Sequence, residues 1–126
     1  MNEIKKILIP IDFSAVSLNA IRHANSILQE HPAEVVLVYV NTPERKLREQ
    51  EILNSFRKFE ENHLTGIFFS YSFDVRHGKL LNVLANVTLC HTPDYTIMGL
   101  RERVPDIALA SELMRLRKKS NTMVTA

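Results

Sequence analysis

The chain has 126 residues and a formal net charge of +2; 45% of its residues are hydrophobic and 24% are charged. These values are ordinary for a soluble globular protein, predict one domain over residues 1–126, and exclude intrinsic disorder and collagen-like repeats. The longest apolar runs are far shorter than the roughly 20 residues that span a bilayer, and no signal peptide opens the chain, so we expect a cytoplasmic protein without a membrane partner.

Short apolar runs alternate with helical patterns along the first third of the chain. Residues 6–11 and 34–40 are rich in β-branched residues, which is typical of strands buried on both faces of a parallel sheet. Between them, apolar residues recur at three- and four-residue spacing. This predicts a helix with Ser14 as its N-cap and Pro32 just beyond its end.

The rest of the chain continues the alternation. Pro43 suits the first position of a helix, and Gly78 separates a strand from the helix that follows. Strands that alternate with helices predict an α/β fold, a five-stranded open parallel sheet with helices on both faces, Rossmann-like in its layers. The remaining expected elements are a helix over 43–63, a strand over 67–75, a helix over 79–91, a strand over 95–98, a helix over 105–119 and a short strand over 122–126.

In a sheet of this kind, ligands bind outside the carboxyl ends of the strands, where the strand order reverses. The loops to consider are therefore those over 10–14, 40–43, 76–79 and 99–105. Glycines in such loops let backbone N–H groups approach a phosphate closely, and a helix N-terminus adds a favourable partial charge.

Three stretches resemble the universal stress protein family. Residues 10–14, PIDFS, are similar to its Pro-x-Asp-x-Ser opening, residues 75–78, VRHG, to the segment before its third helix, and residues 94–99, DYTIMG, to its Asp-x-Ile-Val-Met-Gly fourth strand. The resemblance covers nearly the whole chain in the right order. It implies a five-stranded parallel α/β fold and a homodimer, in which the last strand, here with Met123 and Val124, often pairs across the interface.

The same resemblance implies a division between members that bind ATP and members that do not. Binding members follow the fourth strand with Gly, two residues, Gly, nine residues, then Gly and Ser or Thr. Here Gly99 supplies the first glycine, Glu102 replaces the second, and the third position falls on Glu112, or on Ala110-Ser111 if two residues are deleted. Because a carboxylate repels a nearby phosphate by about 1 kcal/mol or more, we expect the family's usual ATP binding to be lost.

Four residues are candidates for contact with an adenine nucleotide, ATP or AMP, if one binds: Asp12, Val40, Gly99 and Ser111. In ATP-binding relatives the residue that matches Asp12 lies beside the adenosine, and the residue that matches Val40 contacts adenine. The alternative for Asp12 is that it orders the turn into the first helix. The alternative for Val40 is ordinary packing of its strand.

No residue set predicts catalysis or a metal site. Ser14 has no neighbouring base and no Gly-x-Ser-x-Gly elbow, so we interpret it as an N-cap. Cys90 and His91 are adjacent on a predicted helix and do not face each other, and a free cysteine is usually a buried hydrophobe. His77 is a weak ligand candidate near the carboxyl edge. The five histidines are scattered singly, without metal-ligand spacing.

Positive charge gathers at the end of the last predicted helix, over residues 115–119. We interpret these cations as complementing the helix macrodipole, since no aromatic residues stand among them to stack on bases and the net charge is small. No nucleic-acid partner is expected.

Together these patterns predict a non-catalytic stress-response or regulatory protein that has no cofactor and acts through a homodimer and an unidentified protein partner. The alternative is an adenine-nucleotide-binding regulatory module with a shortened phosphate loop.

Overall fold

The computed structural model describes residues 4–28, 32–91, 93–99 and 121–125. The predicted helix over 105–119, the segment after Gly99 and the candidate Ser111 lie outside them. In chain order the elements are β1 (Lys5–Ile11), α1 (Ala15–Leu28), β2 (Ala33–Asn41), α2 (Glu49–His63), β3 (Ser70–His77), α3 (Leu80–His91), β4 (Tyr95–Gly99) and β5 (Asn121–Thr125).

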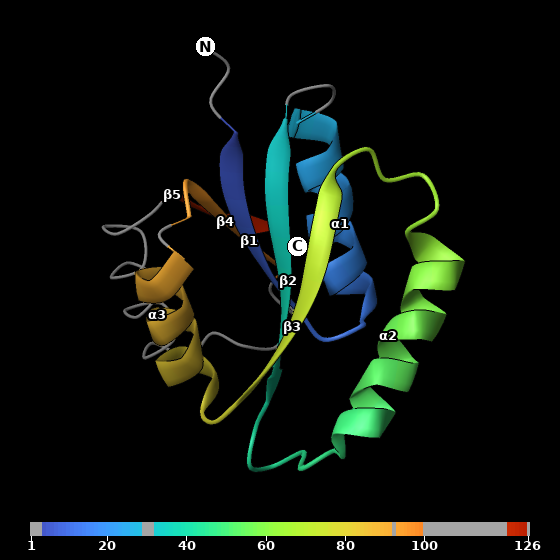
Figure 1. Cartoon of the computed structure of the whole chain (residues 1–126), viewed down its shortest axis with the longest axis vertical. Helices are drawn as coiled ribbons and strands as arrows, with labels where there is room; N and C mark the ends of the chain where they lie inside the picture. The colour runs from blue at the N-terminus through green and yellow to red at the C-terminus, as the bar shows by residue number, and fades with distance from the viewer. Residues whose placement is uncertain (1–3, 29–31, 92, 100–120, 126) are drawn as a thin grey trace.

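The strands form one sheet in the order β3-β2-β1-β4-β5, and every neighbouring pair is parallel. Figure 1 shows α1 and α2 against one side of this sheet and α3 against the other. The expected α/β fold with a parallel sheet is therefore confirmed. Strand order reverses between β1 and β4, because the chain adds β2 and β3 on one side of β1 and then returns to the other.

The central strands are buried on both faces, which explains their nearly continuous apolar sequences. In β1, Ile7, Ile9 and Ile11 belong to the core under α1, whereas Leu8 belongs to the core under α3. Each of the four side chains is at most 5% exposed. Because successive side chains of a strand point to opposite faces of the sheet, β1 contributes side chains to both cores.

Aromatic rings dominate the core between the sheet and α2. Phe56 of α2 stacks on Phe73 of β3, with ring centroids 4.0 Å apart, and Phe59 of α2 lies 5.8 Å from Phe13. Phe13 in turn stacks on the buried ring of Tyr39, at 5.0 Å. Such ring pairs contribute beyond the area they bury, so α2 is held to β2 and β3 mainly by this aromatic group.

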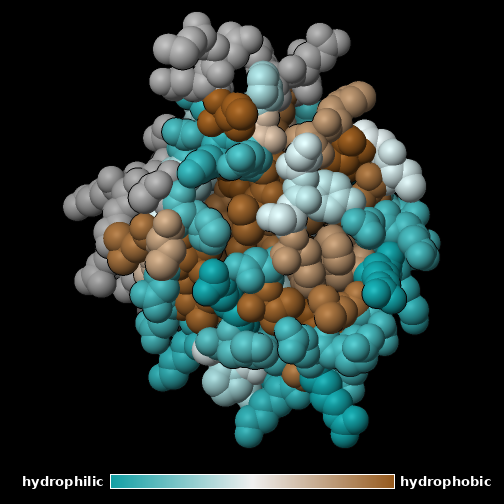
Figure 2. Space-filling view, viewed as in Figure 1, coloured by the Kyte–Doolittle hydropathy of each residue, from teal (hydrophilic) through white to brown (hydrophobic). Residues whose placement is uncertain are grey.

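The second core lies under α3. Val83, Leu84 and Val87 of α3 pack on Leu8, Val38, Val40 and Met98 of the sheet. In the view of Figure 1, Figure 2 shows apolar side chains gathered in the middle of this face, with hydrophilic side chains around them. Apolar side chains therefore gather on both faces of the sheet, as is typical of a parallel sheet.

Two predicted elements have wrong boundaries. α2 begins at Glu49 rather than at Pro43, because the Asn41 side chain binds the backbone of Leu47 and holds residues 42–47 as an extended connection with a short turn. β3 begins at Ser70 rather than at 67.

The residues just before β3 explain its late start. Ile67 and Phe69 pack against the core under α1, and the Phe68 N–H donates to Oδ1 of Asn25, at 2.9 Å. This apolar segment therefore closes the amino end of the core instead of joining the ladder with β2.

Tyr71 links β3 to α2. Its hydroxyl donates to Oε2 of Glu60, at 2.6 Å. Burial, with the hydrogen bond to Glu60 and the negative charge of that residue, raises the pKa of Tyr71 to about 12. The folded chain therefore holds this proton more tightly than the unfolded chain, whose tyrosines titrate near pH 10.

We expect the free energy of unfolding to fall as pH rises from about 10 to about 12, because the unfolded state releases the Tyr71 proton first. The loss is at most about 2–3 kcal/mol, and solvent screening reduces it. Urea unfolding at pH 9 to 11 should show a smaller decline for Tyr71→Phe than for the wild type. Equal slopes for the two chains would contradict the assignment.

Candidate functional site

The carboxyl edge of the sheet carries the candidate site, at the point where strand order reverses between β1 and β4. β1 pairs with β2 along its whole length, up to Ile11. Its pairing with β4 is limited to Ile7 with Tyr95 and Leu8 with Thr96. Pro10 lies two residues beyond Leu8 in β1 and has no backbone N–H to donate. Hydrogen bonds between β1 and β4 are therefore fewer toward the end that bears Asp12 and Gly99.

Asp12 lies at the centre of a hydrogen-bond network that starts α1. Its Oδ1 accepts from the backbone N–H of Ser14 at 3.1 Å, from the Ser14 hydroxyl, and from the Ser17 hydroxyl at 2.7 Å. The Asp12 N–H donates to Oγ of Ser17, also at 2.7 Å. This arrangement orders the turn from β1 into α1. Asp12 therefore has the structural role that the sequence offered as the alternative to ligand contact.

Ser14 is the N-cap of α1, as predicted. Its Oγ accepts from the N–H of Ser17 at 3.3 Å, and its carbonyl accepts the first helical bond, from Leu18. Ser17, which is 4% exposed, was not singled out from the sequence. Its position three residues after an N-cap serine was the available signal, since the side chain there can return to the turn.

Phe13 takes a backbone conformation that is rare for a bulky residue, with φ at 65°. The stacking of its ring on Tyr39 and its contacts with Phe56, Phe59 and Phe73 hold it there. The turn between Asp12 and Ser14 is therefore held from both sides, by polar bonds on one and by aromatic packing on the other.

The other candidate residues differ in what surrounds them. The Val40 side chain is 8% exposed and packs with Val83, Leu84 and Met98 under α3. Gly99 is the last residue of β4 and pairs with Thr125 of β5. Among the candidates that the structure describes, the fold brings Asp12 and Gly99 to the same edge of the sheet and encloses Val40 in its core.

A second polar group lies at this edge, between the ends of β2 and β3. Asn41 donates from Nδ2 to the carbonyl of Leu47 at 2.8 Å and lies 3.4 Å from Nδ1 of His77. The Gly78 N–H, in a residue with φ at 138°, donates to the Asn41 carbonyl. His77 was a candidate from the sequence and Asn41 was not, although an asparagine at the end of a buried strand is a signal for a side chain that orders a loop.

A groove of about 410 Å³ lies between the carboxyl half of β3 and α3. Its volume falls within the roughly 300–1,000 Å³ of small-molecule sites. It lies beside an outer strand, away from the reversal between β1 and β4. The groove is lined by Val75, Arg76, His77, Val83, Asn86, Val87 and Cys90.

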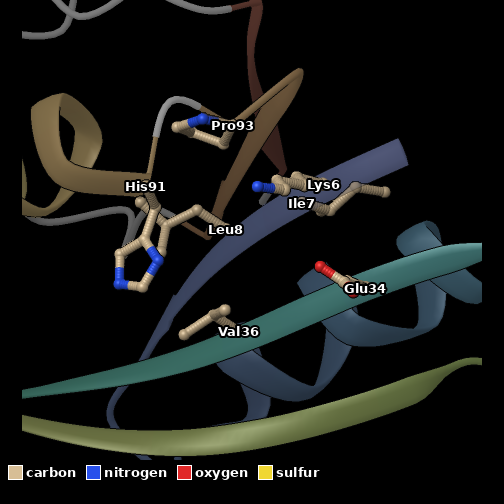
Figure 3. Close-up of a pocket in the computed structure, with 7 residues that line it drawn as sticks. All are labelled: Lys6, Ile7, Leu8, Glu34, Val36, His91 and Pro93. Carbon is tan, nitrogen blue, oxygen red and sulfur yellow. The ribbon is translucent and has the colours of Figure 1, made fainter. Parts of the chain in front are cut away.

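A smaller cavity of about 70 Å³ lies toward the amino ends of β1 and β2. Figure 3 shows His91 reaching from the end of α3 over Leu8 and Val36, with Lys6 and Glu34 on the neighbouring strands. Nε2 of His91 is buried there and has no hydrogen-bond partner among the described residues. This volume is far below the roughly 300–1,000 Å³ of small-molecule sites, so the cavity is too small for a nucleotide.

Cys90 is exposed, which corrects the expectation that it is buried. The buried stripe of α3 runs through Val83, Leu84, Val87 and Thr88, and Cys90 lies off this stripe. Within the described ranges, no three His, Cys, Asp or Glu side chains gather closely enough to hold a metal ion. Of the helices in the same ranges, none combines the length and apolar character needed to cross a bilayer.

The comparison with family models decides the family. The model of the universal stress protein family matches residues 3–125, nearly the full chain. The chain belongs to the universal stress protein family. The comparison with curated proteins gives no match.

Solved structures of other universal stress proteins share the fold. UspA from Lactobacillus plantarum is 16% identical, with a TM-score of 0.69, over 98% of this chain and 97% of that one. A universal stress protein in complex with cAMP is 16% identical, with a TM-score of 0.70, over 97% and 94%. A family member from Arabidopsis thaliana with AMP bound is 14% identical, with a TM-score of 0.61, over 96% and 88%. At these identities the likeness shows the fold alone.

One residue of the universal stress protein pattern acts at the opposite edge of the sheet. Oδ2 of Asp94 accepts from the Lys6 N–H at 2.9 Å, and the Asp94 N–H donates to the Lys6 carbonyl at 2.8 Å. This pair fixes the start of β4 against the start of β1. Asp94 therefore stabilises the pairing of β4 with β1 and lies at the opposite end of β4 from the carboxyl edge.

Proposed function

We propose that this universal stress protein is a cytoplasmic, non-catalytic regulatory protein that lacks the family's usual ATP binding and acts through a homodimer and protein partners. The observation that carries the proposal is the state of the nucleotide site. Glu102 replaces a phosphate-loop glycine, and the third glycine is also missing.

The geometry at Asp12 supports the same proposal. Its Oδ1 accepts hydrogen bonds from Ser14 and Ser17, so that oxygen already serves the start of α1. Val40 is enclosed by α3 side chains rather than presented at the edge. A ligand at this edge would therefore meet a turn ordered by its own bonds and a phosphate loop without its glycines.

The second candidate function is an adenine-nucleotide-binding regulatory module. It is favoured by the cAMP and AMP held by two proteins of the same fold, and by the position of Asp12 and Gly99 at one edge of the sheet. Asp12, Val40, Gly99 and Ser111 would line such a site, and a shortened loop would suit AMP better than ATP.

Calorimetric titration with ATP, AMP and cAMP, with Mg²⁺ present, tests the proposal. We expect no saturable heat for ligand up to about 1 mM, where the binding free energy has fallen to about −4 kcal/mol. Saturable binding at micromolar concentration would contradict the proposal and favour the nucleotide-binding module.

A variant at Glu102 tests whether the phosphate loop alone accounts for the loss of ATP binding. If a pocket remains and only the loop is lost, Glu102→Gly should strengthen ATP binding by at least about fivefold, because it removes a repulsion of about 1 kcal/mol and frees the backbone. Glu61→Gln, on an exposed part of α2, is the control for losing one negative charge. No gain in the Glu102 variant would show that the pocket itself has gone.

A further inference from the structure

Among the described residues, β3 is an outer strand of the sheet and is paired along one edge, with β2. Its ladder with β2 runs without a bulge from Ser70 to His77. No strand of the described residues lies on its other side, and Figure 1 shows it as the last strand of the sheet there. An outer strand of this length presents a row of N–H and C=O groups that can pair with another chain.

The backbone groups that point outward follow from one hydrogen bond. The Gly78 N–H donates to the Asn41 carbonyl at 3.2 Å, so the backbone N–H of Gly78 points toward β2. The N–H and C=O groups of successive residues point to opposite edges of a strand, and the register with β2 is unbroken. The residues whose backbone groups point away from the sheet are therefore Tyr71, Phe73, Val75 and His77.

The charged side chains of β3 lie on the face opposite the aromatic group. Arg76 Nε contacts Oδ2 of Asp74 at 2.8 Å, and the two side chains are 46% and 34% exposed. An ion pair this exposed contributes little to the stability of the monomer. The two residues nevertheless place one negative and one positive charge two positions apart along an open edge.

We propose that β3 pairs with β3 of a second copy of this chain, antiparallel, with Val75 of the two copies opposite each other. The two Val75 residues then exchange both of their backbone hydrogen bonds, and Phe73 does the same with His77 of the second copy. Every outward group from Phe73 to His77 gains a partner. In this register Asp74 of each copy lies opposite Arg76 of the other, on the same face.

The charges favour this register over its two neighbours. Centring the pair on Asp74 would place two aspartates directly opposite each other, and centring it on Arg76 would do the same with two arginines. Like charges directly opposite destabilise a strand pair, whereas opposite charges stabilise it. The occupant with the complementary pattern is thus a second copy of the same strand.

Sedimentation velocity with paired charge variants tests the inference. Asp74→Arg places like positive charges opposite each other, and Arg76→Asp places like negative charges opposite each other. We expect each variant to raise the dimer dissociation constant by about tenfold or more, which is about 1.4 kcal/mol. An equal mixture of the two variants should restore association, because each faces the opposite charges of the other. The double variant should also associate as the wild type does.

Glu61→Arg, a charge reversal on an exposed part of α2, is the matched control and should leave the dissociation constant unchanged. The inference is overturned if the wild type stays monomeric up to about 1 mM, the range of the weakest measurable association. It is also overturned if the single variants associate as the wild type does, as pairing through β5 at the far edge would allow, or if their mixture does not recover.

The inference rests on the proposed function, because both take the protein to act as a homodimer. The two fail separately, because the charge variants at β3 report on self-association and the nucleotide titrations report on the carboxyl edge of the sheet.

Discussion

Replacing Phe59 with alanine is expected to lower the free energy of unfolding by about 3–5 kcal/mol, the usual cost of removing a buried phenylalanine. Phe59 is 6% exposed and belongs to the core under α1. Its ring also lies against Phe13, which holds the turn at Asp12. The substitution therefore weakens the attachment of α2 and the packing of the candidate site together. Urea denaturation of the wild type and the variant gives the difference.

Leu53→Ala is the matched control on the same helix. Leu53 is 38% exposed, so its truncation should change the free energy of unfolding by no more than about 0.5 kcal/mol. Similar losses for the two variants would contradict the view that aromatic burial, rather than the helix as such, holds α2 to the sheet.

Replacing Asp12 with alanine is expected to lower the free energy of unfolding by about 2–3 kcal/mol. The substitution removes an acceptor shared by Ser14 and Ser17, and hydrogen bonds to charged groups are among the stronger ones in proteins. The Ser17 hydroxyl is left with one partner fewer in a buried position. Thermal and urea unfolding both report this loss.

Asp12→Asn separates acceptor from charge. The amide oxygen keeps the position of Oδ1, so this variant should lose about 1 kcal/mol or less. A stability unchanged by Asp12→Ala would contradict the structural role. The nucleotide-binding module would then gain support.

The strand boundaries show how far local patterns extend. Apolar runs predicted β1 and β2 closely, because strands buried on both faces must be apolar along their length. The run over 67–69 was predicted as part of β3 for the same reason, but Ile67 and Phe69 fill the core from outside the ladder. An apolar run indicates that its residues are buried, but the segment against which they pack depends on the fold.

The candidate site was predictable in part. The order of strands and helices indicates a sheet with a site at its carboxyl edge, and Asp12, Gly99 and His77 all lie at strand ends there. The roles of Asn41 and Ser17 were missed, since each depends on a residue several positions away that the backbone brings close. Cys90 was expected in the core, and only the direction of the α3 stripe shows it to be exposed.

The sequence by itself determined the parallel α/β fold and the family, and it predicts the loss of the phosphate-loop glycines, because these depend on residue type and order along the chain. Only the tertiary structure decided that Asp12 is bonded to Ser14 and Ser17, that Val40 is enclosed, and that β3, with its opposite charges, is an outer strand among the described residues. Contacts of this kind depend on which segments lie side by side, and strand order, rather than local pattern, sets that arrangement.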